Sequence, residues 1–352
     1  MTYLKIILTL FFSVFMMGKT FALKPLSDSE MANVEAQALM SLSYLDQKNN
    51  PNKNIGFYRL GLEADIELNA NIKRLQLGCG GLKGSGCDID IENLSLVGIN
   101  PINGNYAGTD AKISNPFIEF AIKNPESAAL REVVGLRLGA LSALGKLGLG
   151  SNSDLSTLSD DVGGIHSLSG DINIMITNTV LNNLNIGGLV TTKALIDSYS
   201  KNLILNRAST ITLDGVSAKT GSLYLGFIPL PGGLTLSNAT LKDYPTSGFH
   251  EILISQNSEG TIPTSDAGLT FQTEPIQWQK ISTGSFQNTV VNQPGWWLSL
   301  PRAIISNVST QQRIDVPLFE AIGGIFGREI IINPLDSGQR GIVNCYGNLK
   351  FC

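Results

Sequence analysis

The sequence predicts an all-β fold, an elongated antiparallel or solenoid-like sheet with one short helix near the N-terminus. Three observations lead to this prediction: apolar residues alternate with polar ones over long runs, turn-forming residues separate these runs, and charged residues are only 15% of the chain. Alternation with a period of two is typical of a strand that covers one face. Frequent turn residues between short runs favour all-β over βαβ architecture.

Residues 1–22 have the pattern of a secretory signal. Lys5 precedes a mostly apolar run over residues 6–17, and Thr20 and Ala22 are small residues at the −3 and −1 positions of the expected cleavage site. The run is shorter than the roughly 20 residues of a membrane-spanning helix. We therefore expect the mature chain to begin at Leu23, to contain no transmembrane helix, and to act in the periplasm, on the outer-membrane surface or outside the cell.

The charge of the mature chain argues against a nucleic-acid partner. Removal of Lys5 and Lys19 with the signal leaves 23 of the 25 basic residues against 29 acidic ones, so the formal charge falls from −4 to −6. Nucleic-acid-binding proteins instead carry a basic surface.

Four cysteines form two close pairs, Cys79 with Cys87 and Cys345 with Cys352. In an oxidising compartment each pair would most simply close a small loop, although four cysteines allow three connectivities. Neither pair has the C-x-x-C spacing or the nearby histidine of a zinc site. We predict disulfides Cys79–Cys87 and Cys345–Cys352.

The first elements after the signal are a helix and a long alternating run. Ser27 and Glu30 match a capping box at the start of a helical pattern that extends to Leu42. From residue 58 to residue 72 the period is two, and we expect a structural spine whose large apolar side chains share one face: Tyr58, Leu60, Leu62, Ile66, Leu68 and Ile72. A single strand over this run would be much longer than usual, which implies an elongated sheet or a bend part-way.

Further alternating runs continue beyond residue 170, in one second β region that extends to residue 352. The apolar pairs and triplets of these runs include Ile172-Ile174-Ile176, Leu184-Ile186, Ile211-Leu213, Leu223-Leu225-Phe227, Leu234-Leu236, Ile252-Ile254, Leu269-Phe271, Trp296-Leu298-Leu300, Ile314-Val316 and Ile330-Ile332. Residues 23–150 form the first region, and residues 133–150 fit a strand or a helix. Residues 151–169 are a candidate linker, and the two regions are left as one domain or two. No strict repeat decides for or against a solenoid.

The motifs of common enzymes are absent from the sequence. His250-Glu251 begins like a zinc-protease helix, but no second histidine follows at the required spacing. No nucleophile elbow, phosphate loop or dinucleotide-binding motif occurs. We therefore predict no catalytic residue and no cofactor. Trp296 and Trp297 point to opposite faces of an extended chain, so we expect at least one to be buried.

Asp88, Asp90 and Glu92 place three carboxylates on one strand face, and they are weak candidates for calcium ligands. Calcium takes 6–8 oxygen ligands, but the calcium-loop pattern fails at Asn93 and Ile99. A solubilising role for these acids is favoured. Paired carboxylates could also cleave glycosides, which requires a spacing that the sequence does not give.

Four segments carry a resemblance to a known family: LSDSEM at residues 26–31 with QAL at 37–39, NIGFYRLG at 54–61, LQLGCGG at 75–81 and NPFIEFAIKNP at 115–125. In these segments the chain resembles the FilA type of pilus assembly protein of Gram-negative bacteria. The resemblance implies a non-enzymatic exported protein that assists or belongs to a surface fibre, with other cell-surface or pilus assembly proteins as partners. Self-assembly is left open.

Two other function classes stay open. One is an extracytoplasmic β protein whose apolar sheet face holds a lipid or a glycan, and the other is a β-solenoid carbohydrate-active enzyme. An unpaired strand edge would favour assembly by strand addition. An open apolar groove would favour ligand carriage, and carboxylates that converge in a cleft would favour the enzyme.

Overall fold

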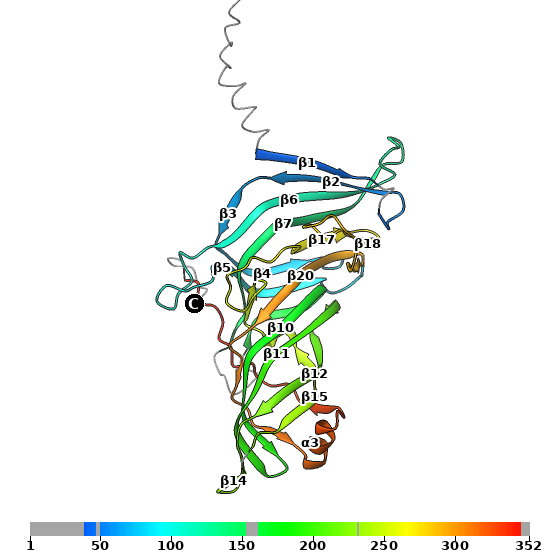
Figure 1. The fold of residues 1–352 in the computed structure, drawn as a ribbon. Coiled ribbons are helices and arrows are strands. Elements are labelled where there is room, and N and C mark those ends of the chain that lie inside the picture. The colour runs from blue at the N-terminus through cyan, green and yellow to red at the C-terminus, as the bar shows by residue number, and fades with distance from the viewer. Residues whose placement is uncertain (1–38, 47–49, 153–160, 231, 346–352) are drawn as a thin grey trace, which may run out of the picture. The chain divides into compact units, whose positions relative to one another are not determined.

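The computed structural model describes residues 39–46, 50–152, 161–230 and 232–345. Strands make up most of this part of the chain, so the all-β prediction is confirmed (Figure 1). The expected signal, the expected N-terminal helix up to residue 38, and Cys352 lie outside the described residues. The prediction that the helix extends to Leu42 is wrong, because residues 40–42 belong to the strand Met40–Leu45, which pairs with the next strand. The residues from Met40 onward form one unit, to which the following description applies.

Among the described residues of this unit, the helical elements are a 3-10 turn, η2 (Thr246–Gly248), and a short helix, α3 (Leu318–Ile325). The strands, in chain order, are β1 (Met40–Leu45), β2 (Ile55–Leu62), β3 (Asp65–Leu68), β4 (Ala70–Leu77), β5 (Ile89–Val97), β6 (Ala111–Lys123), β7 (Glu132–Leu149), β8 (Ser151–Asn152), β9 (Asp161–Val162), β10 (Gly164–Ile186), β11 (Leu189–Ala208), β12 (Thr210–Thr220), β13 (Leu223–Leu225), β14 (Ile228–Leu230), β15 (Thr235–Pro245), β16 (Glu251–Ile254), β17 (Gly268–Gln272), β18 (Ile276–Gln277), β19 (Val291–Asn292), β20 (Gly295–Ile305), β21 (Ser309–Thr310), β22 (Ile314–Val316) and β23 (Ile330–Ile332).

One part of the sheet, the open region, consists of β1, β2, β6, β7, β17 and β20, each antiparallel to the next. β3 also pairs with β6, whereas β4 pairs with β5. The run over residues 58–72 is therefore three strands with bends, not one. At the second bend, the Asn69 amide donates to the backbone oxygens of Tyr106 at 3.1 Å and Thr109 at 2.5 Å, and the chain passes from one partner strand to another.

β10, 23 residues long, connects the open region to the rest of the sheet. One edge of β10 pairs with β11 along nearly its whole length. The other edge pairs first with β5 and then with β20, β21 and β22, which run parallel to it. Residues 164–169, which the sequence analysis placed in a candidate linker, are the first part of β10, and the two expected β regions share one sheet.

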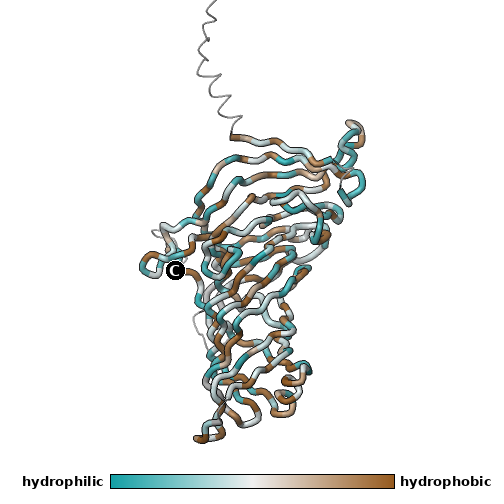
Figure 2. The backbone as a smooth tube through the Cα atoms, in the orientation of Figure 1, coloured by the Kyte–Doolittle hydropathy of each residue, from teal (hydrophilic) through white to brown (hydrophobic). Residues whose placement is uncertain are grey.

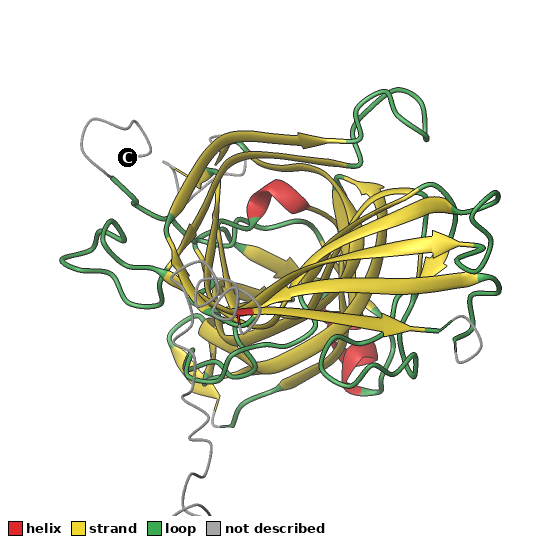
Figure 3. Ribbon diagram, turned by 90° about the horizontal axis from the view of Figure 1, so that it is seen from above, coloured by secondary structure: helices red, strands yellow, loops and turns green. Residues whose placement is uncertain are grey.

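The other part of the sheet, the closed region, consists of β10, β11, β12, β15, β22 and β23. β12 pairs with β15, β15 pairs with β23, and α3 connects β22 to β23. Figure 3 shows that the strands curve strongly instead of lying flat. Their apolar faces enclose one core, whose fully buried side chains include Leu184, Ile186, Leu213, Ile305 and Ile330.

The residues that fitted a strand or a helix, 133–150, form strand β7 and the turn after it. This strand pairs with four others, β5, β6, β16 and β17. Several of its positions are glycine because the neighbours are close: a Cβ on Gly139 would lie 2.8 Å from the Phe117 ring.

Candidate functional site

Apolar side chains form two rows across one face of the open region, and we call this surface the apolar face. Directly opposite residues of antiparallel strands project to the same side of a sheet. The ladder registers therefore place two sets of six residues in line, Leu42–Leu60–Ile118–Leu138–Leu269–Leu298 and Tyr44–Tyr58–Phe120–Leu136–Phe271–Trp296. Ring contacts within the second row, Tyr44 with Tyr58 at 4.4 Å and Phe271 with Trp296 at 5.4 Å between centroids, agree with this placement.

The exposure of the apolar face increases toward β1. Leu269 and Leu298 are half-buried and pack against the main core. Leu60 is 40% exposed and Leu42 is 79% exposed. Met40, Leu60, Leu62, Ile118 and Leu138 line an open hollow of 400 Å³ on this face. In Figure 2 these strands alternate between brown apolar and teal polar segments, as the sequence pattern predicts.

β1 lies at the edge of the open region and is the uppermost strand in Figure 1. Within the described residues it pairs with β2 alone, so its second edge has no ladder partner there. A strand edge with free N–H and C=O groups is a template for another strand. The apolar face thus extends to an edge that can accept a further chain.

The predicted spine residues lie on this half-exposed surface. Tyr58, Leu60 and Leu62 of β2 belong to the apolar face, and Ile66, Leu68 and Ile72 lie on β3 and β4. All except Tyr58 are more than a third exposed. Large apolar side chains gain stability when they are covered, and the described residues leave these partly open.

The opposite face of the open region carries a buried ionic cluster that the sequence analysis missed. Arg59, Glu119 and Arg137 are directly opposite one another on β2, β6 and β7. Glu119 accepts hydrogen bonds from Arg59 Nε at 3.1 Å, from Arg137 Nε at 2.8 Å, and from the amide of Gln279 at 2.7 Å. Arg137 Nη1 also donates to the backbone oxygen of Gln279 at 2.6 Å.

Aromatic rings complete this cluster. The Arg59 guanidinium lies 4.3 Å from the centroid of the Phe117 ring, and the Arg137 guanidinium lies 5.0 Å from that of Trp278. Burial lowers the pKa of Arg137, while the Glu119 carboxylate opposes this effect. Because each charged group has partners within the fold, the cluster holds the segment around Trp278 against the sheet. In the sequence, each of these charged residues lies between two apolar ones, in YRL, IEF and LRL. The sequence does not show that the three side chains meet, because this depends on the pairing register of β2, β6 and β7.

A cleft of 510 Å³ lies beside the face of the open region that carries the ionic cluster. The polar residues that line this cleft include Asp171, Asn173, Asn202, Asp266 and Thr289. Burial raises the pKa of Asp171, whose Oδ1 accepts hydrogen bonds from Trp297 Nε1 at 2.7 Å and from Ser299 Oγ at 2.5 Å. Asp266 accepts from the backbone N and the hydroxyl of Ser282, at 2.7 and 2.8 Å. Both carboxylates are thus held by neighbouring groups of the fold.

The three weak calcium candidates each contact a basic side chain. Asp88 lies 3.0 Å from Arg207 Nε. Asp90 accepts two hydrogen bonds from Arg74, at 3.0 and 3.1 Å, which hold its pKa below the usual range. Glu92 lies 3.3 Å from a ring nitrogen of His166. In the part of the chain that the structure describes, no group of three or more His, Cys, Asp or Glu side chains is arranged to hold a metal ion.

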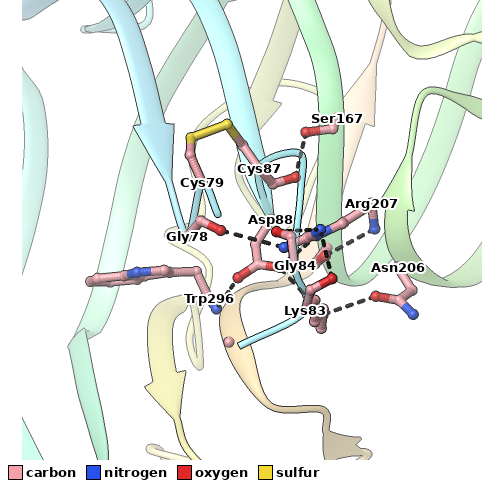
Figure 4. A network of polar contacts seen from close by, with 12 residues as sticks. Gly78, Cys79, Lys83, Gly84, Cys87, Asp88, Ser167, Asn206, Arg207 and Trp296 are labelled. Atoms are coloured by element: carbon pink, nitrogen blue, oxygen red, sulfur yellow. Dashed lines mark hydrogen bonds and ion pairs between the residues drawn. A yellow bond between two sulfur atoms is a disulfide. The ribbon is translucent and has the colours of Figure 1, made fainter. Parts of the chain in front are cut away.

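The Cys79–Cys87 disulfide is confirmed, and it closes a loop that Arg207 holds from the end of β11 (Figure 4). The Arg207 guanidinium donates to the backbone oxygen of Ser85 at 2.6 Å and to Asp88 at 3.0 Å. Asp88 in turn accepts from the backbone N of Trp296 at 2.9 Å. We call this set of contacts the loop clasp. Cys345 is also disulfide-bonded, and Cys352, its predicted partner, lies outside the described residues.

Two glycines make the loop clasp possible. A Cβ on Gly78 would lie 2.1 Å from a carboxylate oxygen of Asp88, and one on Gly295 would lie 2.4 Å from the same atom. Both glycines also have positive φ, at 71° and 99°, which other residues rarely adopt. The clasp therefore joins the β4–β5 hairpin, the end of β11 and the start of β20.

The two tryptophans and His250, which the sequence analysis also considered, are packed within the sheet. Trp297 is completely buried, as expected for at least one of the two tryptophans, and Trp296 lies on the apolar face. His250 is also fully buried, with its Nδ1 2.9 Å from the backbone oxygen of Leu149.

None of the helices in the described part of the chain has the length and apolar character that a membrane crossing needs. Comparisons of the chain with models of protein families, with curated proteins and with solved structures find no match.

Proposed function

We propose that the protein is an exported, non-enzymatic component or assembly factor of a surface fibre, and that its apolar face receives a strand of another fibre subunit. One observation carries this proposal: the apolar face extends without interruption to β1, whose outer edge has no ladder partner among the described residues. A strand added at such an edge gains backbone hydrogen bonds, and its alternate apolar side chains extend the two rows and pack beside Leu42 and Tyr44 of β1. Apolar surface that the added subunit buries there contributes about 25 cal/mol per Å².

Two further observations support this proposal. The Cys79–Cys87 disulfide suits an oxidising compartment outside the cytoplasm. The segments that resemble FilA-type pilus assembly proteins include β2 and β6, which form the centre of the apolar face. Pilus assembly through strand addition explains why these strands alternate so regularly and yet remain half-exposed.

The proposal is tested by deleting the gene and examining the cell surface for fibres by electron microscopy. We expect the deletion to remove fibres or reduce their number, and the wild-type gene to restore them. A variant with Leu60→Lys and Ile118→Lys should be exported and folded without restoring fibres, because two charges then oppose burial of the apolar face. The matched control is Leu82→Lys, at an exposed position of the disulfide loop, and it should restore fibres.

Two outcomes would contradict the proposal at different points. Normal fibres in the deletion strain would exclude a role in fibre assembly. Restoration of fibres by the folded Leu60→Lys, Ile118→Lys variant would exclude the apolar face as the site of subunit addition.

A second candidate function is ligand carriage on the same face. It is favoured by the hollow lined by Leu60, Leu62, Ile118 and Leu138, whose volume of 400 Å³ is within the usual range of ligand sites, roughly 300–1,000 Å³. Native mass spectrometry of the exported protein tests this alternative. A co-purified lipid or glycan that the Leu60→Lys, Ile118→Lys variant lacks would favour carriage over assembly.

A further inference from the structure

The closed region ends in a second apolar surface, unrelated to the apolar face. Its first part is the β13–β14 hairpin, where Leu225 and Ile228 are exposed and Phe227, in the turn between them, is fully exposed. The turn forms at Gly226, whose φ of 62° favours glycine. Phe227 was expected to continue the strand that contains Leu223 and Leu225, but it projects from the tip instead.

The second part is α3, which has its apolar side chains on the wrong face for a water-exposed helix. The buried residues of α3 are the small ones, Ala321 and Gly324. Its large apolar residues, and the one that follows, are exposed: Leu318, Phe319, Ile322, Ile325 and Phe326, with Phe319 at 86% and Phe326 at 82%. A soluble helix normally buries its apolar side chains and exposes polar ones. This reversed arrangement indicates a surface that contacts something other than water.

The hairpin and α3 lie at the same end of the closed region. Leu225 of β13 is opposite Leu189 of β11, next to the β10–β11 turn. At that turn a Cβ on Gly187 would lie 2.4 Å from the Cβ of Leu318, so the start of α3 packs on the turn itself. Figure 1 shows β14 and α3 in the lower part of the molecule, away from β1. We call these exposed residues of the hairpin and α3 the apolar end.

The charges around the apolar end suit a lipid surface. No charged residue occurs from Thr220 to Leu241. Lys219 and Lys193 lie at the border of this neutral stretch, on neighbouring strands, where the backbone N of Gly221 donates to the backbone oxygen of Lys193 at 3.0 Å. Neutral tips with flanking lysines match a bilayer, in which apolar side chains enter the acyl region and ammonium groups meet the phosphates.

Acidic residues near the apolar end do not dominate its charge. Asp315 of β22 is paired with Arg313, with Nε and Oδ1 2.9 Å apart. Over residues 185–195, 217–241 and 311–332 there are four basic residues, Lys193, Lys219, Arg313 and Arg328, against three acidic ones, Asp315, Glu320 and Glu329. These segments therefore contain one more basic than acidic residue, whereas the chain as a whole has an excess of acidic residues.

We propose that the apolar end docks on the surface of a phospholipid bilayer, with Phe227 and the exposed apolar side chains of α3 in the acyl region and Lys193 and Lys219 at the phosphates. The shape of the site favours a bilayer over a protein groove, because the exposed tip of a hairpin and the convex face of a helix fit a deformable phase. This docking is independent of strand addition at β1, which uses a different part of the sheet.

The first experiment places a reporter at the tip. The Phe227→Trp variant is mixed with vesicles of phosphatidylcholine and phosphatidylglycerol at about 7:3, and the tryptophan emission is recorded. We expect a blue shift with these vesicles and a smaller one with phosphatidylcholine alone, because the lysines favour anionic headgroups. The matched control, Leu82→Trp on the disulfide loop, should show no shift. Trp278 and Trp297 are buried and Trp296 is half-buried, so wild-type protein mixed with the same vesicles measures the background of the native tryptophans.

The second experiment removes the apolar side chains. Phe227→Ser combined with Phe319→Ser should lower the fraction of protein that sediments with the vesicles about tenfold or more. The thermal midpoint should not change, because both side chains are exposed. Leu82→Ser should sediment like the wild type.

Three results would overturn the proposal. They are a wild type that does not sediment with vesicles, a double variant that sediments as the wild type does, and a Phe227→Trp blue shift that rises with protein concentration in the absence of lipid. The last result would identify a second copy of the chain as the occupant.

Discussion

The open and closed regions of the sheet are built from strands with the same alternating pattern, but they use it in opposite ways. In the closed region, the alternating residues of β10, β12 and β22 face one another, and Leu184 is 1% exposed. In the open region, the equivalent residues of β1, β2 and β6 face outward, and the covered side contains the Arg59–Glu119–Arg137 cluster instead. Alternation therefore defines which residues share a face, but not whether that face is covered.

The largest expected difference between the two regions is in their tolerance of a charge. Leu184→Asp should prevent folding, because burying an unpaired carboxylate and losing a core side chain costs about 5 kcal/mol or more, comparable with the stability of a typical domain. Leu60→Asp, at the 40% exposed position, should change the free energy of unfolding by about 1 kcal/mol. Circular dichroism of purified Leu184→Asp tests for loss of the fold, and urea unfolding of Leu60→Asp measures its change in the free energy of unfolding. Equal loss of stability would mean that the apolar face is covered in the folded protein.

The next prediction concerns the covered side of the open region. Arg137→Ala removes one partner of a buried ion pair and leaves Glu119 with less compensation, so the free energy of unfolding should fall by about 3–5 kcal/mol. Lys123→Ala is the control, because Lys123 pairs with Glu274 at a partly exposed site, where ion pairs contribute little. If chemical denaturation gives the same midpoint for both variants, the cluster does not hold the covering segment in place.

A smaller effect is expected at the loop clasp, near the junction of the two regions. Replacing Cys79 and Cys87 by serine should lower the free energy of unfolding by about 2–3 kcal/mol, because the closed loop restricts the unfolded chain. The thermal midpoint of the double variant tests this value. Limited proteolysis should also cut within residues 80–86 faster than in the wild type. An unchanged midpoint together with unchanged cleavage would show that Arg207 and Asp88 alone are sufficient to hold the loop.

The smallest expected effect is a pH dependence that arises at Asp171, where β10 meets β20. Burial raises the folded-state pKa of this carboxyl above its ordinary value of 3.8. The stabilisation that follows is complete below the ordinary pKa and is lost as the pH rises through the folded-state pKa. Asp171→Asn keeps an acceptor for Trp297 Nε1 and does not titrate. The midpoint of the wild type should thus fall relative to that of Asp171→Asn as the pH rises above the ordinary pKa of 3.8, and parallel pH profiles would contradict this assignment.

Much of the strand pattern could be predicted from the sequence, because it depends on local alternation. All the short alternating runs beyond residue 170 lie at least partly in strands, from Ile172 in β10 to Ile332 in β23. β11 was missed because its centre, Ser198-Tyr199-Ser200, interrupts the apolar pattern. α3 was missed because Gly323 and Gly324 disfavour a helix.

The candidate sites were harder to predict from the sequence, because they depend on which strands become neighbours in the sheet. Leu60 and Ile118 are visibly alternating residues, but only the pairing of β2 with β6 brings them into one row. Arg59 and Arg137 are far apart along the chain, and their meeting at Glu119 requires the register of three strands. The apolar end depends on a turn at Gly226 and on the direction in which α3 packs, neither of which follows from local alternation.

The position of β20 in the sheet also sets an order in which strands can pair as the chain emerges. β20 pairs with β17 on one side and with β10 on the other, and β21 and β22 continue along the same edge of β10. If the chain crosses the membrane from its N-terminus, residues 170–186 emerge long before residues 295–316 can pair with them. This edge of β10 is unprotected in the interval, and pairing over such sequence separations is slow. Until the last part of the chain arrives, this edge of β10 is a place where the chain can mispair or aggregate.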